Sequence, residues 1–263
     1  MTTTPLPREI APGIFWLGKC VEIPFQGQIL HSYNSVFLVV GEDASVTIEA
    51  GYPEEVEEVD GFIEAFLAQG VPEVKYCFVT HTETPHAGGV GRYLQRFPNA
   101  TAIGDVSDLH LVFPEYKDRI RAANPGESFD LGGRRLSIVQ AVFRDHINSR
   151  WAFDENTRTL FAGDGFSYAH YHAVDQCGKL AEEVEIPDLP DMVAFYAGAA
   201  FNWTTHTDIE PYIKRLNSLV FDELRVNLIA PTHGLPIGDP TVTMPSIEEG
   251  LRIGSSRVDV EVF

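Results

Sequence analysis

Candidate metal-binding side chains follow strand-like segments at four separate places in this chain of 263 residues. The segment Val74–Thr80, rich in β-branched and aromatic residues, leads directly into His81. Comparable segments precede His146, Asp164 and His233. Residues at strand exits lie on loops that rigid elements hold in place, so a sheet edge can gather them from distant parts of the sequence. This arrangement predicts an α/β sandwich.

The remaining patterns agree with that fold class. The first third of the chain predicts antiparallel strands at residues 13–17, 35–40 and 45–49, then a helix that begins near Pro53. Apolar spacing further along predicts a helix at 89–97, strands at 135–143 and 158–162, a helix around 209–220 and a strand at 226–230. No linker or repeat divides the chain, so one domain over residues 1–263 is expected. Segment 239–263 is less patterned and is expected to be a C-terminal tail, packed across the domain or forming a homodimer contact.

Composition limits the partners and the compartment. A formal net charge of -19 disfavours nucleic acid, whose binding depends on Lys and Arg. The N-terminus has no apolar core of a signal peptide, and no apolar run approaches the roughly 20 residues of a membrane span, so we expect a cytoplasmic protein. The three cysteines, Cys20, Cys77 and Cys177, fit no zinc-finger spacing. We expect them to be buried, reduced thiols.

The loop after the strand at 74–80 is the most specific motif. It reads His-Thr-Glu-Thr-Pro-His-Ala-Gly-Gly and places His81, Glu83 and His86 within six positions. It resembles the His-x-His-x-Asp-His-x-Gly-Gly loop of the metallo-β-lactamase superfamily, with Glu83 in place of the second His and Pro85 in place of the Asp. The resemblance implies an αβ/βα sandwich in which two mixed sheets are flanked by helices.

Glu83 makes the loop similar to that of the flavodiiron proteins within this superfamily. Segments 32–39, 195–197 and 228–234 also resemble that branch. The resemblance implies that His81, Glu83, His146 and a bridging Asp164 hold one metal. It implies that His86, Asp164 and His233 hold the other. A carboxylate in place of an imidazole favours iron over zinc, so two iron ions that bind O2 or NO are expected, with two zinc or two manganese ions as the alternative.

Two departures from the flavodiiron pattern affect the expected function. Pro85 cannot coordinate, which implies an open position on the second metal. No phosphate-binding loop for FMN is found in the sequence, so electrons are expected from an external donor. A diiron oxidoreductase or oxygenase and an oxygen sensor with a signalling partner both remain open. The alternative is a metal-dependent hydrolase of an ester, lactone or phosphodiester, in which the metals activate water.

Several residues near the expected ligands could have catalytic or orienting roles. Tyr168 and His172 follow Asp164 and are candidate catalytic residues that could donate a hydrogen bond or a proton, although packing or surface roles stay open for each. His170, Tyr171, Tyr33 and Tyr196 are weaker candidates for the same role. Asp145 could orient a ligand imidazole or be a solvated loop carboxylate. Three further histidines fit no motif position: His31, His110 and His206.

Overall fold

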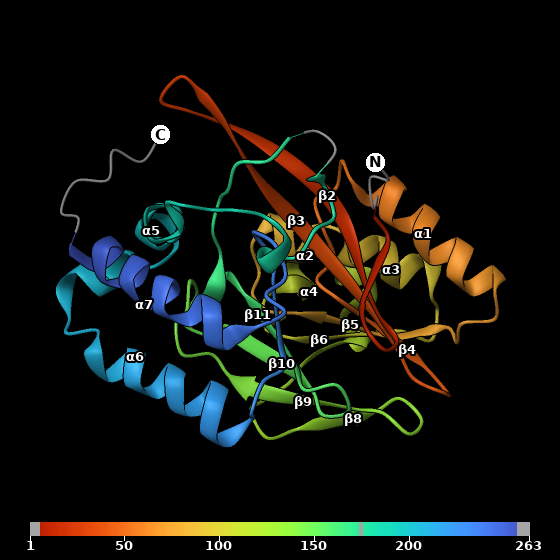
Figure 1. Cartoon of the computed structure of the whole chain (residues 1–263). Helices are drawn as coiled ribbons and strands as arrows, with labels where there is room; N and C mark the ends of the chain where they lie inside the picture. Colours follow the sequence, from red (N-terminus) through yellow and green to blue (C-terminus); the bar gives the residue numbers. More distant parts are fainter. Residues whose placement is uncertain (1–5, 174–175, 257–263) are drawn as a thin grey trace.

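Two mixed β-sheets form the centre of the protein in this computed structural model, which describes residues 6–173 and 176–256 (Figure 1). The seven strands of the first sheet lie in chain order: β1 (Arg8–Ala11), β2 (Ile14–Phe25), β3 (Gln28–Val40), β4 (Ser45–Ile48), β5 (Val74–Val79), β6 (Thr101–Gly104) and β7 (Ile120–Ala122). β1 to β4 pair antiparallel, and β4 to β7 pair parallel.

The second sheet has the order β12-β11-β10-β9-β8. Its strands are β8 (Ser128–Asp130), β9 (Arg135–Gln140), β10 (Arg150–Asp154), β11 (Thr159–Gly163) and β12 (Leu228–Pro231). Only the β11 and β12 pair is parallel. The predicted sandwich of two mixed sheets is therefore confirmed.

Helices cover the sheets on two sides. α1 (Val56–Ala68) and α3 (Val90–Arg96) bury one apolar face each against the first sheet, in a cluster with Leu17 and Leu38. A larger apolar cluster fills the space between the sheets and continues to α5 (Leu189–Ala200), α6 (Glu210–Asn217) and α7 (Pro240–Ser256). A π-helical turn at Ser218–Glu223 extends α6. The short elements are α2 (Thr84–Ala87), α4 (Leu109–Val112), η1 (Pro114–Arg119), η2 (Asp164–Phe166), η4 (Ala181–Glu183) and η5 (Asn202–His206).

The structure adds two features that the sequence patterns did not predict. β2 and β3 continue far past the predicted strands and pair over their whole length, from Ile14 with Val39 to Phe25 with Gln28. Residues 240–256 of the expected tail form α7, while residues 257–263 lie outside the described residues. α7 packs closely on α5, since a Cβ at Gly250 would lie 2.5 Å from the Cβ of Val193. None of the helices in the described part is long and apolar enough to cross a membrane.

Arg134 joins the two sheets through a buried ion pair. Its Nε donates to Asp154 Oδ1 in β10 at 2.8 Å, and its Nη1 donates to the backbone oxygen of Val40 in β3 at 2.7 Å. Nη2 donates to the backbone oxygen of Pro12 at 2.7 Å. Removing one partner of a buried pair leaves the other charge without compensation in a poorly solvated position.

We expect Arg134→Leu to lower the free energy of unfolding by roughly 3–5 kcal/mol, because Asp154 would stay buried and ionised without its partner. Denaturant unfolding followed by circular dichroism measures this change. Arg135→Leu, at the exposed neighbouring position, is the matched control and should change stability by less than about 0.5 kcal/mol. Equal effects of the two substitutions would show that the buried pair does not hold the sheets together.

Candidate metal centre

The six predicted metal-site residues come together at one end of the two sheets. His81 follows β5, Glu83 precedes α2, and His86 lies within α2. The other three, His146, Asp164 and His233, lie after β9, β11 and β12. His81, Asp164 and His233 lie within two residues of a strand end, and His86 lies in a short helix, so regular elements hold these four side chains in position.

Asp164 lies between two groups of side chains. Its Oδ2 is 3.6 Å from His81 Nε2. Its Oδ1 is 3.3 Å from His86 Nε2 and 3.6 Å from His233 Nε2. Each carboxylate oxygen thus has its own set of imidazole neighbours, which is the geometry of a carboxylate shared by two metal ions.

Glu83 and His146 complete the group on the His81 side. Glu83 Oε2 lies 4.0 Å from His81 Nε2, and Glu83 Oε1 lies 3.8 Å from His146 Nε2. The donor atoms of His81, Glu83, His86 and Asp164 all lie within 4.8 Å of one another. Glu83 and His146 are also more exposed than the other members, so this side of the site is open to solvent.

The Nδ1 atoms of these histidines contact protein oxygens, which leaves the Nε2 atoms directed at the centre. His233 Nδ1 donates to the backbone oxygen of Tyr33 at 2.7 Å. His81 Nδ1 lies 3.1 Å from Thr80 Oγ1, and His146 Nδ1 lies 3.5 Å from Thr82 Oγ1. Contacts of this kind fix the ring orientation and the tautomer of metal-binding histidines.

The imidazole of His86, the fourth of the site, contacts Glu49, a residue that the sequence did not indicate. Glu49 directly follows β4 and is 1% exposed. His86 Nδ1 lies 3.0 Å from Glu49 Oε1, which also accepts from the hydroxyls of Thr80 at 2.5 Å and Thr232 at 3.1 Å. A carboxylate behind a metal-binding histidine raises the basicity of the ring. The sequence signal was an acidic residue directly after a short buried strand.

The protonation states in the metal-free protein follow from burial and from these neighbours. Burial lowers the pKa of His86, but the Glu49 and Asp164 carboxylates outweigh it and raise the pKa to about 10. Burial, followed by the charge of His86, keeps the pKa of His81 well below its usual value. For Asp164, burial acts to raise the pKa, but His86 and His81 overcome it and hold the pKa well below its usual value. The site therefore holds an ionised Asp164, a neutral His81 and a positively charged His86 ring that is protonated on both nitrogens.

The donor set fits metal ions. Among the described residues, the buried atoms His81 Nε2, His86 Nε2 and Asp164 Oδ1 have no hydrogen-bond partner. Buried polar atoms without partners cost about 1–3 kcal/mol each. A metal ion on each side of Asp164 would satisfy all three atoms, and the imidazole and carboxylate donors suit iron, zinc or manganese.

Pro85 has a structural role at its position. It occupies the first turn of α2, where the fixed φ of proline suits helix initiation and its missing N–H costs nothing. The short helix separates Glu83 from His86, so the two residues face different sides of Asp164. Among the described residues, Asp164 is the carboxylate that contacts the Nε2 atoms of His86 and His233, whereas Glu49 contacts His86 on its Nδ1 side.

Asp145 lies closer to the donor atoms than a solvated loop residue would. Its Oδ2 is 3.5 Å from His81 Nε2 and 3.9 Å from His146 Nε2. Burial, followed by the charges of Asp164 and Glu83, raises the pKa of Asp145 to about 7. Asp145 is thus a third carboxylate at the His81 side, beyond the six predicted residues.

The two candidate catalytic residues lie in different surroundings. Tyr168 is fully buried, and its hydroxyl donates to the backbone oxygen of Leu235 at 3.0 Å. His172 contacts Cys20 rather than the six metal-site residues. The Tyr196 ring stacks on His233, with ring centroids 5.5 Å apart. The catalytic roles of Tyr168 and His172 stay predictions, and we expect Tyr196 to shield the imidazole of His233 from solvent.

Comparison with known proteins identifies relatives of the whole fold. The family model described as the metallo-beta-lactamase superfamily matches residues 31–233. A coenzyme F420H2 oxidase from Methanocaldococcus jannaschii is 24% identical over 92% of this chain and 59% of its own length. A nitric oxide reductase from Moorella thermoacetica is 23% identical over 87% of this chain and 57% of its own length. The chain thus spans less than two thirds of these relatives.

Solved structures agree on the fold. The rubredoxin:oxygen oxidoreductase of Desulfovibrio gigas superposes with a TM-score of 0.74 at 15% identity, over 93% of this chain and 60% of that one. The flavodiiron protein of Giardia intestinalis gives a TM-score of 0.71 at 18% identity, over 94% of this chain and 59% of that one. The predicted similarity to flavodiiron proteins is confirmed at the level of fold and relatives.

We predict that Glu49→Gln weakens metal binding about 10- to 100-fold, because a neutral amide no longer raises the basicity of His86. Iron bound per chain after anaerobic loading at limiting Fe²⁺ measures the effect. Glu42→Gln, on an exposed turn, is the matched control and should bind iron as the wild type does. Unchanged iron binding in Glu49→Gln would show that this carboxylate does not strengthen metal binding by His86.

Metal binding should release protons, because a metal ion and a proton compete for His86 Nε2. With a metal-free pKa of about 10, His86 is protonated below that pH, so apparent affinity should rise by up to about tenfold per pH unit as pH rises from 6 to 8. Calorimetric titration with Fe²⁺ in buffers of different ionisation enthalpy counts the protons released. Glu49→Gln should release fewer, and a proton count of zero in the wild type would contradict the assigned charge states.

Proposed function

This chain belongs to the metallo-beta-lactamase superfamily, and we propose that it is a non-haem diiron protein that binds and reduces O2 or NO with electrons from an external donor. Relatives named as a coenzyme F420H2 oxidase and a nitric oxide reductase support this reaction class. In this proposal His81, Glu83, His146 and Asp164 hold one iron ion, and His86, Asp164 and His233 hold the other.

The placement of Asp164 is the observation that carries the proposal. Its Oδ2 faces His81 and its Oδ1 faces His86 and His233, at 3.3 to 3.6 Å. A pair of metal ions could use both oxygens of this buried carboxylate, one on each side. Two iron ions would supply the redox chemistry for O2 or NO, and the adjacent Glu83 favours iron over zinc because a carboxylate is a harder ligand than an imidazole.

The protein side chains have separate tasks in this proposal. Glu49 holds the ring of His86 in place, and Tyr33 does the same for His233 through its backbone oxygen. Asp145 is half-buried beside His81 and has a pKa raised to about 7 by burial and then by Asp164. Before a metal ion binds, its Oδ2 can hold a proton near neutral pH, whereas a cation bound at His81 would favour the ionised carboxylate.

Pro85 favours a second candidate function, an oxygen sensor. In the described part of the chain, Asp164 is the carboxylate that contacts the Nε2 atoms of both His86 and His233, so an iron ion there would carry less anionic ligation than one beside Glu83. Fewer anionic ligands raise a reduction potential, which slows the transfer of electrons onward to O2. A metal site that reduces bound O2 slowly suits a protein that signals the presence of oxygen to a partner protein.

The deciding experiment combines metal analysis with spectroscopy. We expect about two iron ions per chain in protein expressed with iron, and a new visible band when the reduced protein meets air. A band that decays quickly with continued O2 consumption supports an oxidoreductase, and a persistent band supports a sensor. Two zinc ions per chain with no spectral response, together with anaerobic hydrolysis of esters or phosphodiesters, would overturn the proposal in favour of a hydrolase.

We predict that Pro85→Asp raises iron occupancy on the His86 side by about tenfold at limiting metal, because it adds a carboxylate in the first turn of α2. It should also shorten the lifetime of the visible band. Pro85→Ala is the control, since it removes the proline and adds no ligand. If Pro85→Asp and Pro85→Ala bind iron equally, position 85 does not face the second metal.

A further inference from the structure

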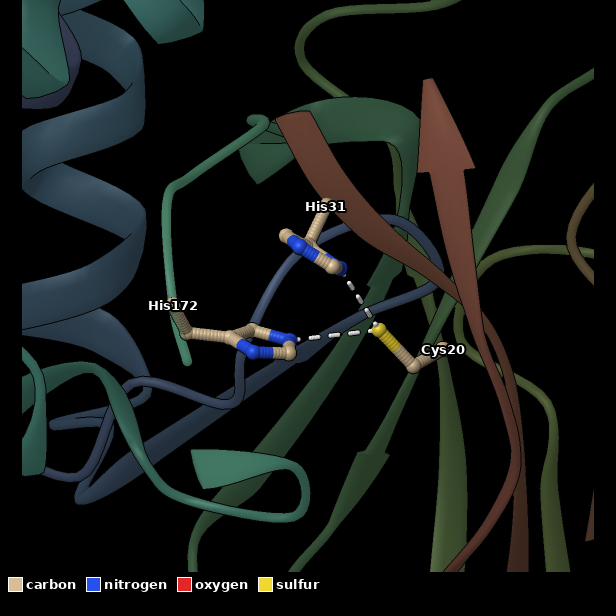
Figure 2. A group of neighbouring side chains, drawn as sticks. All are labelled: Cys20, His31 and His172. Atoms are coloured by element: carbon tan, nitrogen blue, oxygen red, sulfur yellow. Dashed lines mark hydrogen bonds between the residues drawn. The ribbon is translucent and has the colours of Figure 1, made fainter. Parts of the chain in front are cut away.

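A second group of metal-binding side chains lies on the long β2–β3 hairpin, separate from the six residues described above. Cys20 on β2, His31 on β3 and His172 place their donor atoms within 4.8 Å of one another (Figure 2). Cys177 adjoins them, with its Sγ 3.8 Å from His172 Nε2. Of the three thiols, Cys77 is buried as expected, whereas Cys20 and Cys177 are only partly buried.

The hairpin places Cys20 and His31 on one face. Cys20 pairs with Tyr33, and Glu22 pairs with His31, so Cys20 and His31 are diagonal neighbours in the ladder. Side chains of such diagonal pairs lie on the same face of the strands and can reach each other. Figure 2 shows that His31 and His172 both contact the sulfur of Cys20.

Two backbone contacts fasten the other half of the group to the same hairpin. The His31 N–H donates to the His170 oxygen at 2.7 Å, and the His170 N–H donates to the His31 oxygen at 2.9 Å. This bridge positions His172 two residues later. The Gly178 N–H donates to the Tyr33 hydroxyl at 2.9 Å, which positions the adjacent Cys177. The four side chains are thus held in place by the fold.

The spacing of the donor atoms matches a tetrahedral zinc site. Zn–S and Zn–N bonds of about 2.3 and 2.0–2.1 Å at tetrahedral angles separate a sulfur and a nitrogen ligand by about 3.5 Å. Cys20 Sγ lies 3.4 Å from His31 Nδ1 and 3.2 Å from His172 Nε2. Cys177 Sγ lies 3.8 Å from His172 Nε2 but is not in the group whose donor atoms all lie within 4.8 Å of one another, so it would move closer to become the fourth ligand. The rings of His31 and His172, stacked with centroids 3.9 Å apart, would turn so that both lone pairs meet at the ion.

The tautomer of His172 also suits metal binding. Its Nδ1 donates to the backbone oxygen of Ala173 at 2.7 Å, so in the neutral ring Nε2 carries the lone pair. That lone pair faces both sulfur atoms. Burial, followed by the neighbouring Cys177, raises the pKa of the Cys20 thiol to about 12. A single thiol proton cannot serve two imidazoles at once, whereas one metal ion can bind all four side chains.

We propose that Cys20, His31, His172 and Cys177 bind one zinc ion, in a Cys2His2 site that is independent of the diiron centre. Binding replaces the thiol protons with metal bonds, so two protons leave as the two thiolates form. Four protein ligands leave no position for substrate, so the site is structural and fastens the loop of His172 and Cys177 to the hairpin. The Nε2 of His172 then belongs to zinc, which excludes its role as a proton donor.

Elemental analysis of the purified protein tests this proposal separately from the diiron centre. We expect about one zinc ion per chain in addition to iron in protein expressed with both metals. Cys20→Ser should lower zinc to less than about 0.1 per chain and leave iron unchanged. His81→Gln should lower iron and leave zinc unchanged. His206→Gln, at an exposed histidine outside both groups, should keep both metals.

Two measurements on the wild-type protein keep the test independent of how well the variants fold. Co²⁺ added in place of zinc should give thiolate-to-cobalt charge transfer and tetrahedral d–d bands. Zn²⁺ should slow alkylation of Cys20 and Cys177 by about tenfold or more. The proposal is overturned by equal zinc in the wild type and Cys20→Ser, by alkylation that Zn²⁺ does not change, or by a disulfide between Cys20 and Cys177 in protein purified under reducing conditions.

Discussion

The buried carboxylate of Glu49 is the contact on which the metal centre depends most. It receives hydrogen bonds from Thr80 after β5 and from Thr232 after β12, so it joins the exits of strands from both sheets. It also contacts His86 Nδ1. A buried carboxylate without partners would be costly, and here the same bonds that offset its burial also set the distance between the two sheets at the site.

The electrostatics of the centre follow from that arrangement. Glu49 and Asp164 lie on opposite sides of His86, at 3.0 and 3.3 Å, and together they keep the ring protonated without metal. The positive charge of the protonated ring offsets part of the negative charge of the two buried carboxylates.

A strand exit followed by His or Asp is a local pattern, so the sequence could single out six residues that the structure places together, and their role as metal ligands stays a prediction. The predicted elements β5, α3, β11 and β12 are present, and the six residues lie together. Glu49 could not be identified in this way, and for Asp145 the sequence left a solvated loop position open, since the contacts of both residues involve segments distant in sequence. The group around Cys20 was hidden for the same reason: Cys20 lies 11 positions from His31 and 152 from His172, and these residues meet only through the hairpin register and the bridge to His170. The helix α7 was missed because its small residues, Gly250 and Gly254, read as loop although they allow close contact with α5.

Tyr33 contacts both the metal centre around Asp164 and the group of Cys20, His31, His172 and Cys177. Its backbone oxygen accepts from His233 Nδ1, and its hydroxyl accepts from the Gly178 N–H beside Cys177. The residue is fully buried and lies within the continuous strand β3, so a shift of its backbone would carry its hydroxyl along. Any free energy that a ligand gains by shifting Tyr33 at one group must appear as a changed affinity at the other, and this coupling acts equally in both directions.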